Sequence, residues 1–327
     1  TVPMKPLHLP HTSDAWSNYW KKGFSTTFVS DETDTYSGAT RDHWLEVFSH
    51  LNVGNSVVDL GTGNGAILEI GISSVGADQK QLTWIAVDYA DLANSKFYRG
   101  HPEIQVHDHT SIEDTPLADE SVDLAVSQFG FEYSDTEKAS IELSRFLAPG
   151  ARFRAAIHHA DSSISLHSKS ALQQIAWCQR SELTQTSVKL LRRLSKLNKS
   201  NRDPRSDPRA EELKSFFNQM AERLNGYGDQ MPDASHIGYF LNELGSLFNP
   251  ERAGELSLHQ KIGIVEQLEI DTRGYERRMV SMLNAGLDNA GVEMICDQLS
   301  SAGLKVDLPV AIESESAKMA WKVGATK

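Results

Sequence analysis

Three glycines at alternate positions are the residues of this chain best suited to hold a ligand. Gly61, Gly63 and Gly65 follow the apolar run Ser56–Leu60, and a helix-like segment begins at Ala66. Glycine lets a backbone turn sharply and approach a ligand with no Cβ atom in the way. The first amides of the following helix would face the same ligand. The pattern predicts a cradle for a nucleotide-like cofactor.

Polar side chains also follow the other apolar, β-type runs of the first half of the chain. These positions are Asp88, Asp108 with His109, Gln128–Tyr133, and His158 with His159. The carboxyl ends of parallel strands meet at one edge of a sheet, so we expect these residues to form a single site. Asp88 comes 25 residues after Gly63 and could accept two hydrogen bonds from a ribose diol. Such a carboxylate fits a nicotinamide dinucleotide or S-adenosylmethionine.

The elements that must position this site alternate between strand and helix up to about residue 160, with Pro149-Gly150 ending the helix over 136–147. The alternation predicts an α/β fold: a doubly wound, mostly parallel sheet of seven strands, the last two (305–312 and 318–324) forming an antiparallel edge pair. Residues 161–286 show only helical periodicity and predict an insertion after strand five. The expected domains are 41–160 with 287–327 (α/β), 161–286 (helical cap) and the aromatic-rich 1–40 (N-terminal lid).

Composition narrows the class of protein further. The 327 residues carry a formal net charge of -12, which argues against a nucleic-acid partner, since phosphate contacts need clustered lysine and arginine. No apolar run approaches the roughly 20 residues that span a bilayer, so no membrane association is expected. Cys178 and Cys296 lie far apart and fit free thiols in the cytoplasm. His107, His109 and His158 lack a tight ligand spacing, so no metal is expected.

Several segments resemble, in order, the motifs of class I S-adenosylmethionine-dependent methyltransferases. They are VVDLGTGNG (first motif), WIAVDYA (second), HDHTSIEDTPLADESVDLAVS (third and fourth), RFLAPGARF (before strand five) and VDLPVAIESESAKMAWKVG (the last two strands). The resemblance covers about residues 40–160 and 290–325 and implies S-adenosylmethionine as the cofactor. A nicotinamide-dependent oxidoreductase and a non-catalytic module that binds S-adenosylmethionine remain the alternatives, because the loop also matches a loose dinucleotide fingerprint.

The resemblance assigns a role to each matching residue. It implies that Asp59 orders the loop and reaches the methionine ammonium, while the methionyl end is lined by Gly61, Thr62 and Gly63. It implies that Asp88 holds the ribose and that Tyr89 packs on the adenine, whose edge meets Asp108 and His109. The sulfonium and the substrate would be flanked by Gln128 and Phe129.

Methyl transfer is an in-line displacement in which positioning does much of the catalysis, and a base is needed only for a nucleophile that keeps its proton. The candidate catalytic residues are His158, Glu132 and Tyr133. We expect His158 to be the base, because its strand end faces the site and imidazole titrates near neutrality.

The helical insertion falls on the substrate side of the family's fold, so we expect it to select the acceptor. An enclosing cap favours a small molecule, methylated on oxygen or nitrogen. The basic stretch 189–209 is read as a solvated helix face, with a contact for a substrate phosphate or carboxylate as the alternative. A homodimer stays open as a further partner.

Overall fold

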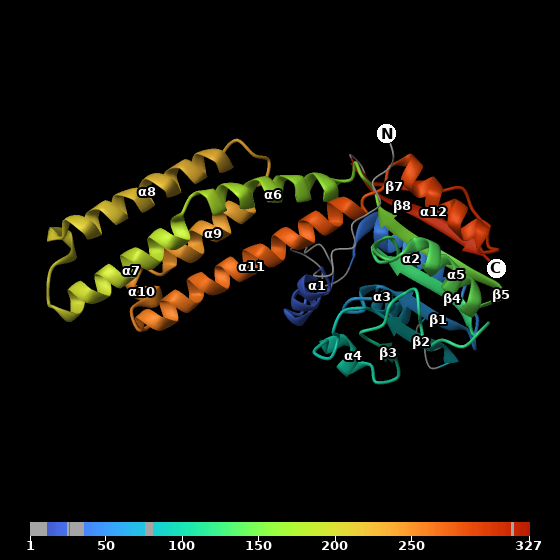
Figure 1. The fold of residues 1–327 in the computed structure, drawn as a ribbon. Helices are drawn as coiled ribbons and strands as arrows, with labels where there is room; N and C mark the ends of the chain where they lie inside the picture. Colours follow the sequence, from blue (N-terminus) through green and yellow to red (C-terminus); the bar gives the residue numbers. More distant parts are fainter. Residues whose placement is uncertain (1–11, 25, 27–35, 76–80, 315–316) are drawn as a thin grey trace. The chain divides into compact units, whose positions relative to one another are not determined.

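The computed structural model describes residues 12–24, 26, 36–75, 81–314 and 317–327 (Figure 1). The chain divides into two compact units. Thr1–Leu166 with Ser281–Lys327 is called the α/β unit below, and His167–Val280 is called the helical unit. Residues 1–11 and 27–35, which belong to the predicted N-terminal lid, lie outside the described residues.

The α/β unit is built on an eight-stranded sheet of order β3-β2-β1-β4-β5-β8-β6, with β7 also paired to β8. The strands are β1 Ser56–Leu60, β2 Thr83–Val87, β3 Gln105–His107, β4 Val122–Gln128, β5 Leu147–His158, β6 Lys305–Val306, β7 Val310–Ser314 and β8 Ala317–Thr326. The strands β1 to β5 are parallel, and β8 runs antiparallel to β5, β6 and β7. The predicted doubly wound, mostly parallel sheet with antiparallel strands at one edge is confirmed.

The sheet has eight strands where seven were predicted, because one strand at this edge is divided. The strand predicted over 305–312 is split into β6 and β7, with Pro309 directly before β7. A proline has no N–H to give to a strand ladder and is tolerated at the first position or at a break. β8 pairs with β6 near its carboxyl end and with β7 near its amino end, so the two pieces act as one interrupted edge strand.

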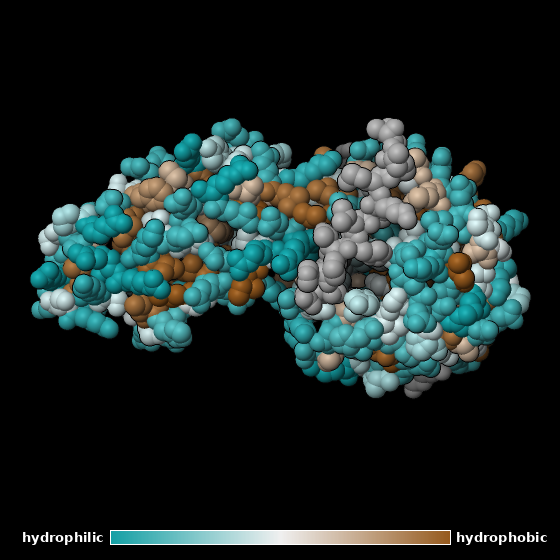
Figure 2. Space-filling model, in the orientation of Figure 1, coloured by the Kyte–Doolittle hydropathy of each residue, from teal (hydrophilic) through white to brown (hydrophobic). Residues whose placement is uncertain are grey.

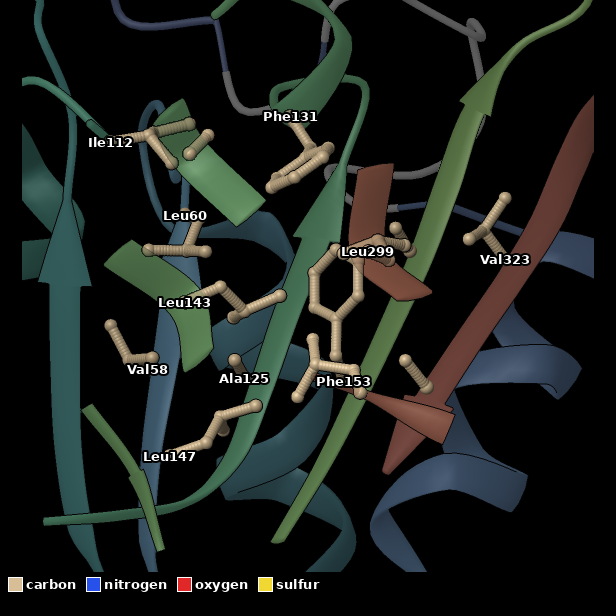
Figure 3. Close-up of a cluster of buried hydrophobic side chains, with 14 of the residues drawn as sticks. Val58, Leu60, Ile112, Ala125, Phe131, Leu143, Leu147, Phe153, Leu299 and Val323 are labelled. Atoms are coloured by element: carbon tan, nitrogen blue, oxygen red, sulfur yellow. The ribbon is translucent and has the colours of Figure 1, made fainter. Parts of the chain in front are cut away.

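Both faces of the sheet are covered by helices (Figure 1). The α/β unit contains α1 Thr12–Lys21, α2 Gly38–Phe48, α3 Ala66–Val75, α4 Lys96–Gly100, a 3-10 turn η2 Phe131–Tyr133, α5 Thr136–Phe146 and α12 Asn289–Ser301. Figure 3 shows Val58, Ala125 and Phe153 of neighbouring strands clustered with Leu143 of α5 and Leu299 of α12. On the opposite face, Trp84 of β2 packs edge-on against Phe48 of α2.

The helix before β5 ends earlier than predicted. α5 stops at Phe146, and Pro149 and Gly150 lie inside β5, which begins at Leu147. Leu147 pairs with Val122, and the register then shifts before the regular part of the ladder. The Pro-Gly pair therefore forms an irregular start to the strand, where the missing proline N–H and the positive φ of Gly150 (80°) are tolerated.

The regular elements between 163 and 285 are all helical. They are α6 Ser163–Arg180, α7 Leu183–Lys199, η3 Pro204–Ser206, α8 Pro208–Gly228, α9 Ser235–Ser246, α10 Pro250–Ala253 and α11 Leu258–Ala285. The chain breaks between α6 and α7 at Glu182, whose φ is 56°. The helix α11 is continuous through Gly274, because packing overrides the weak helix propensity of glycine.

The helical unit has its own apolar core, which includes Leu191, Leu224, Leu244 and Leu268. Its visible surface in Figure 2 is mostly hydrophilic with hydrophobic areas among the helices. No helix in the described part of the chain is long and apolar enough to cross a membrane.

The chain leaves the sheet after β5 and returns to it at one point. Leu287 donates its N–H to the carbonyl of His158 (2.9 Å), and Ala160 donates its N–H to the carbonyl of Leu287 (2.9 Å). The Trp321 indole N–H of β8 donates to the same Leu287 carbonyl (2.8 Å). The two ends of the helical segment are therefore tied together within the α/β unit.

Candidate active site and cofactor cradle

The glycine loop takes the conformation that its sequence predicts. Gly61, Gly63 and Gly65 have φ values of 72°, 54° and 85°, a left-handed region that L side chains rarely occupy. At Gly61 a Cβ atom would lie 2.7 Å from the Cα of Gly130, which follows β4. The loops after β1 and β4 are thus in backbone contact, and both contact positions require glycine.

The amide groups of the loop are already used within the protein. Gly61 and Thr62 donate their N–H groups to the carbonyl of Val87 at the end of β2 (2.8 and 3.1 Å). Gly63 donates its N–H to Asp88 Oδ2 (2.7 Å). A dinucleotide pyrophosphate is bound by free backbone N–H groups, and none of these three is free to receive it. The loop suits a cofactor that approaches without an anion at this point.

Asp88 lies directly after β2, as predicted, and is held by two backbone donors. Its Oδ2 accepts from Gly63 and its Oδ1 from the N–H of Ala90 (2.8 Å). Burial raises the pKa of Asp88, these backbone hydrogen bonds oppose the rise, and the nearby Asp108 adds to it. The contact with Gly63 fixes the carboxylate beside the glycine loop, where the ribose role implied by the resemblance would place it.

Asp59 is the most deeply buried carboxylate of the site, with 1% of its surface exposed. Neither carboxylate oxygen makes a hydrogen bond to a described residue within the usual distance. Burial raises its pKa to about 7, and the neighbouring Thr62 hydroxyl opposes the rise only in part. A buried carboxylate in this state gains from a cationic ligand, which is the chemistry of the methionine ammonium of S-adenosylmethionine.

Tyr98 of α4 makes hydrogen bonds to the glycine loop, a role that was not predicted from the sequence. Its hydroxyl lies 2.8 Å from Thr62 Oγ1 and donates to the carbonyl of Gly63 (3.1 Å). Burial raises the pKa of Tyr98 well above 10, so the phenol keeps its proton and remains a donor. A tyrosine in a short helix carries no sequence signal for such a contact.

The helix α1 lies against the glycine loop. Asn64 donates its side-chain amide to the carbonyls of Trp20 (3.0 Å) and Phe24 (2.7 Å). The indole of Trp20 fills the place where a Cβ of Gly63 would point, with its nearest atom 2.7 Å from that position. These contacts support the lid role that we propose for the described part of residues 12–26.

The end of β4 carries a strained turn with an oriented amide. Phe129 has a φ of 56°, which is uncommon for an aromatic residue and marks a conformation imposed by its surroundings. Before it, the Trp44 indole N–H donates to Gln128 Oε1 (2.6 Å). The Gln128 Nε2 group is buried and has no hydrogen-bond partner among the described residues. Trp44 thereby fixes which end of the Gln128 amide is available to a ligand.

Glu132, Tyr133 and His158 come together beside this turn. Glu132 Oε1 accepts from the backbone N–H of His158 (2.7 Å), whereas Oε2 is inaccessible to solvent and has no partner among the described residues. The imidazole of His158 stacks on Phe129 at 4.2 Å and 8° and meets the ring of Tyr133 edge-on at 5.8 Å. The three predicted catalytic candidates therefore form one cluster.

The electrostatics of the cluster change the order of the candidates. Burial lowers the pKa of His158 to about 3, so its ring is neutral and weakly basic near pH 7. Burial raises the pKa of Glu132 to about 8 and that of Tyr133 well above 10. Strong bases have a high conjugate-acid pKa, so Glu132 replaces His158 as our preferred base. The sequence alone could not show that His158 is fully buried.

The remaining predicted residues lie after β2 and β3. Tyr89 is 62% exposed, and His109 has a φ of 49°. Asp91, Asp108 and His109 place three ligand atoms within 4.8 Å of one another, but Asp91 is paired with Lys21 at 2.9 Å. We assign no metal to this cluster.

The alternative metal set of the sequence is not brought together. His107 and His158 end strands that are four positions apart in the sheet, and a strand spacing of about 4.8 Å separates them by roughly 19 Å. His159 is directed elsewhere than His158: it stacks on Trp321 at 4.6 Å.

Comparisons with known proteins agree with this geometry. Residues 58–155 match the family model described as a methyltransferase domain. No curated protein sequence matches the chain. The α/β unit therefore contains a stretch that matches a methyltransferase domain, in agreement with the resemblance seen in the sequence. The match agrees with S-adenosylmethionine, the cofactor that the resemblance implies.

Similar solved structures include three with low sequence identity. The methyltransferase bound to the Trm112 activator of Haloferax volcanii is 24% identical over 46% of this chain and 61% of that chain, with a TM-score of 0.36. The geranyl diphosphate C-methyltransferase of Streptomyces coelicolor is 15% identical over 46% and 66%, with a TM-score of 0.35. An S-adenosylmethionine-dependent methyltransferase of Aquifex aeolicus is 15% identical over 88% of both chains, with a TM-score of 0.39.

The chain spans less than two thirds of the length of the first two of these structures. All three TM-scores are below 0.5, so these likenesses carry no conclusion about acceptor or partner.

Proposed function

We propose that the chain transfers a methyl group from S-adenosylmethionine to a small molecule, at an oxygen or nitrogen atom that carries a proton. The observation that carries this proposal is the buried group at the ends of β4 and β5, where Glu132 Oε2, the Tyr133 hydroxyl and Gln128 Nε2 are inaccessible to solvent and unpartnered among the described residues. Buried polar atoms are normally hydrogen-bonded, so their presence points to a ligand.

The cofactor would be held by the residues of the first two strands. Asp59 would face the ammonium, the carbonyl side of Gly61–Gly63 would follow the methionyl group, and Asp88 would accept the ribose hydroxyls. When bound, S-adenosylmethionine supplies an electrophilic methyl group on a sulfonium. Asp108 and His109 at the end of β3 are proposed for the adenine edge.

The protein's own contribution to the reaction is positioning and proton removal. Phe129, held in its strained conformation, and the oriented amide of Gln128 would flank the acceptor. Glu132 would take the proton of the nucleophile on Oε2, while the N–H of His158 holds Oε1 in place. Positioning of this kind accounts for a large share of the barrier reduction in displacement reactions.

The net charge of -12 supports a small-molecule acceptor over a nucleic acid. The role of residues 161–286 in selecting the acceptor, a cytoplasmic location and a homodimer also remain part of the proposal.

Calorimetric titration with S-adenosylhomocysteine and with NADH tests which cofactor the chain binds. We expect binding of S-adenosylhomocysteine, an Asp59→Asn variant that binds it at least tenfold more weakly, and no heat with NADH. Binding of NADH alone would favour the oxidoreductase alternative. Binding of S-adenosylhomocysteine with no methyl transfer to any acceptor pool would favour the non-catalytic alternative.

A further inference from the structure

We infer that the methyl acceptor is an amine that binds as a cation, and that Glu132 is both its counter-charge and its proton acceptor. This inference rests on the proposed function and names the substrate class of the same site. It is carried by the shielded Oε2 atom of Glu132, which has no partner among the described residues, and by the aromatic rings of the same cluster.

One oxygen of the Glu132 carboxylate accepts a hydrogen bond, and the other has no partner among the described residues. The backbone N–H of His158 fixes Oε1 at 2.7 Å and thereby fixes the direction of Oε2, which is shielded from solvent. No lysine or arginine of the described residues forms an ion pair with Glu132. A shielded carboxylate needs a cation or a hydrogen-bond donor to be stable as an anion. A cationic ligand supplies both.

The aromatic residues of the cluster add to this preference. Phe129 and His158 are stacked, and Tyr133 lies edge-on to His158 at 5.8 Å and edge-on to Trp16 of α1 at 5.9 Å. Aromatic rings attract ammonium groups through their electron-rich faces, and cages of such rings with a carboxylate are a common way to bind alkylated amines. An acceptor with a phosphate or carboxylate at this position would instead be repelled by Glu132.

The carboxylates on the cofactor side of the site also show which of them is left for the acceptor. Asp59 and Asp88 lie at the ends of β1 and β2, and neither forms an ion pair with a described lysine or arginine. Asp59 has the cofactor ammonium as its proposed partner and Asp88 the ribose. Glu132, in the turn η2 that follows β4, is the carboxylate for which the cofactor provides no assigned partner. We therefore assign it to the acceptor.

The ammonium of the acceptor gives one proton to Glu132 Oε2, which leaves a neutral amine with a free electron pair. That electron pair forms the N–C bond to the methyl carbon while the C–S bond breaks and its electrons go to sulfur. The products are a methylated ammonium ion and S-adenosylhomocysteine. Glu132 releases the proton to solvent after the products leave.

The test uses the full chain, methyl-labelled S-adenosylmethionine and a small-molecule metabolite extract separated by ion exchange into cationic, neutral and anionic fractions. We expect label in the cationic fraction and a loss of about 100-fold or more in the Glu132→Gln variant, the range for removal of a positioned base. Glu137→Gln removes an exposed carboxylate from the first turn of α5 and serves as the matched control, which should keep full incorporation.

The outcomes separate the inference from the proposed function. Label in the neutral or anionic fraction alone would overturn the amine assignment and leave methyl transfer intact. A Glu132→Gln variant that retains incorporation within threefold would overturn the role of Glu132. No label in any fraction would contradict the proposed function itself. Calorimetric binding of S-adenosylhomocysteine to Glu132→Gln shows that the variant is folded and its cofactor site intact.

Discussion

The backbone contact between Gly61 and Gly130 leads to a prediction with a calculable size. A Cβ on Gly61 would lie 2.7 Å from Gly130 Cα, and a Cβ on Gly130 would lie 2.6 Å from the carbonyl oxygen of Leu60. Neither neighbour is a flexible side chain, so the two loops must move apart. Overpacking of this kind costs about 1–3 kcal/mol. Gly61→Ala also places alanine at a φ of 72°, which adds about 1–2 kcal/mol.

We therefore expect Gly130→Ala to lower the free energy of unfolding by about 1–3 kcal/mol and Gly61→Ala by about 2–5 kcal/mol. The double variant should lose less than the sum, because either alanine alone already separates the loops. Urea unfolding followed by tryptophan fluorescence measures all three, and calorimetry with S-adenosylhomocysteine should show weaker binding in each.

Gly100→Ala is the matched control, since its Cβ would meet no described residue within 4 Å apart from its chain neighbours and the backbone of its own helix. Strict additivity of the two alanines, or a Gly130→Ala variant as stable as the control, would refute the contact argument.

Three further changes test the site. The pKa of Asp59 is about 7 in the folded protein and near 3.9 when unfolded, so its contribution is favourable below pH 4 and is lost as the pH rises through 7. Asp59→Asn should remove a slope of up to about 1.4 kcal/mol per pH unit from urea unfolding between those values; an unchanged slope would contradict the assignment. Trp44→Phe leaves Gln128 Oε1 without its donor and should lower stability by about 1–3 kcal/mol and weaken binding of S-adenosylhomocysteine; unaltered calorimetric affinity would mean that the Gln128 amide does not contact the cofactor. Asp88→Asn loses one of two acceptors and should weaken that affinity about 10-fold to 100-fold, unless the contact with Gly63 is its only role.

Much of the fold could be predicted because its signals are local. The apolar run before Gly61 and the strand-helix alternation that follows depend on residues close in sequence. The same holds for the carboxyl-end position of Asp88, because topology alone places strand ends together. The break in the last edge strand at Pro309 was also a local signal, although we expected a continuous strand there.

The supporting contacts of the site could not be predicted, because each joins distant segments. Trp44 orients Gln128 across 84 positions of sequence, and Asn64 reaches back to Trp20 across 44. The choice between His158 and Glu132 depends on burial, which a strand pattern does not report. Polar residues near the ends of two strands look alike in the sequence and differ only once helices and loops pack over them.

The hydrogen bonds at Leu287 have a consequence for how the chain could be altered. Residues 161–285 begin and end at neighbouring backbone positions, since Leu287 is bonded to both His158 and Ala160. A loop that joins two such points closes with little dependence on its length, because the entropy of closure grows only logarithmically. A few glycines and serines between Ala160 and Gly286 could replace the whole helical segment. The remaining chain would keep all strands of the sheet. If the helical segment selects the acceptor, as proposed, grafting segments of very different length at this junction could exchange that preference.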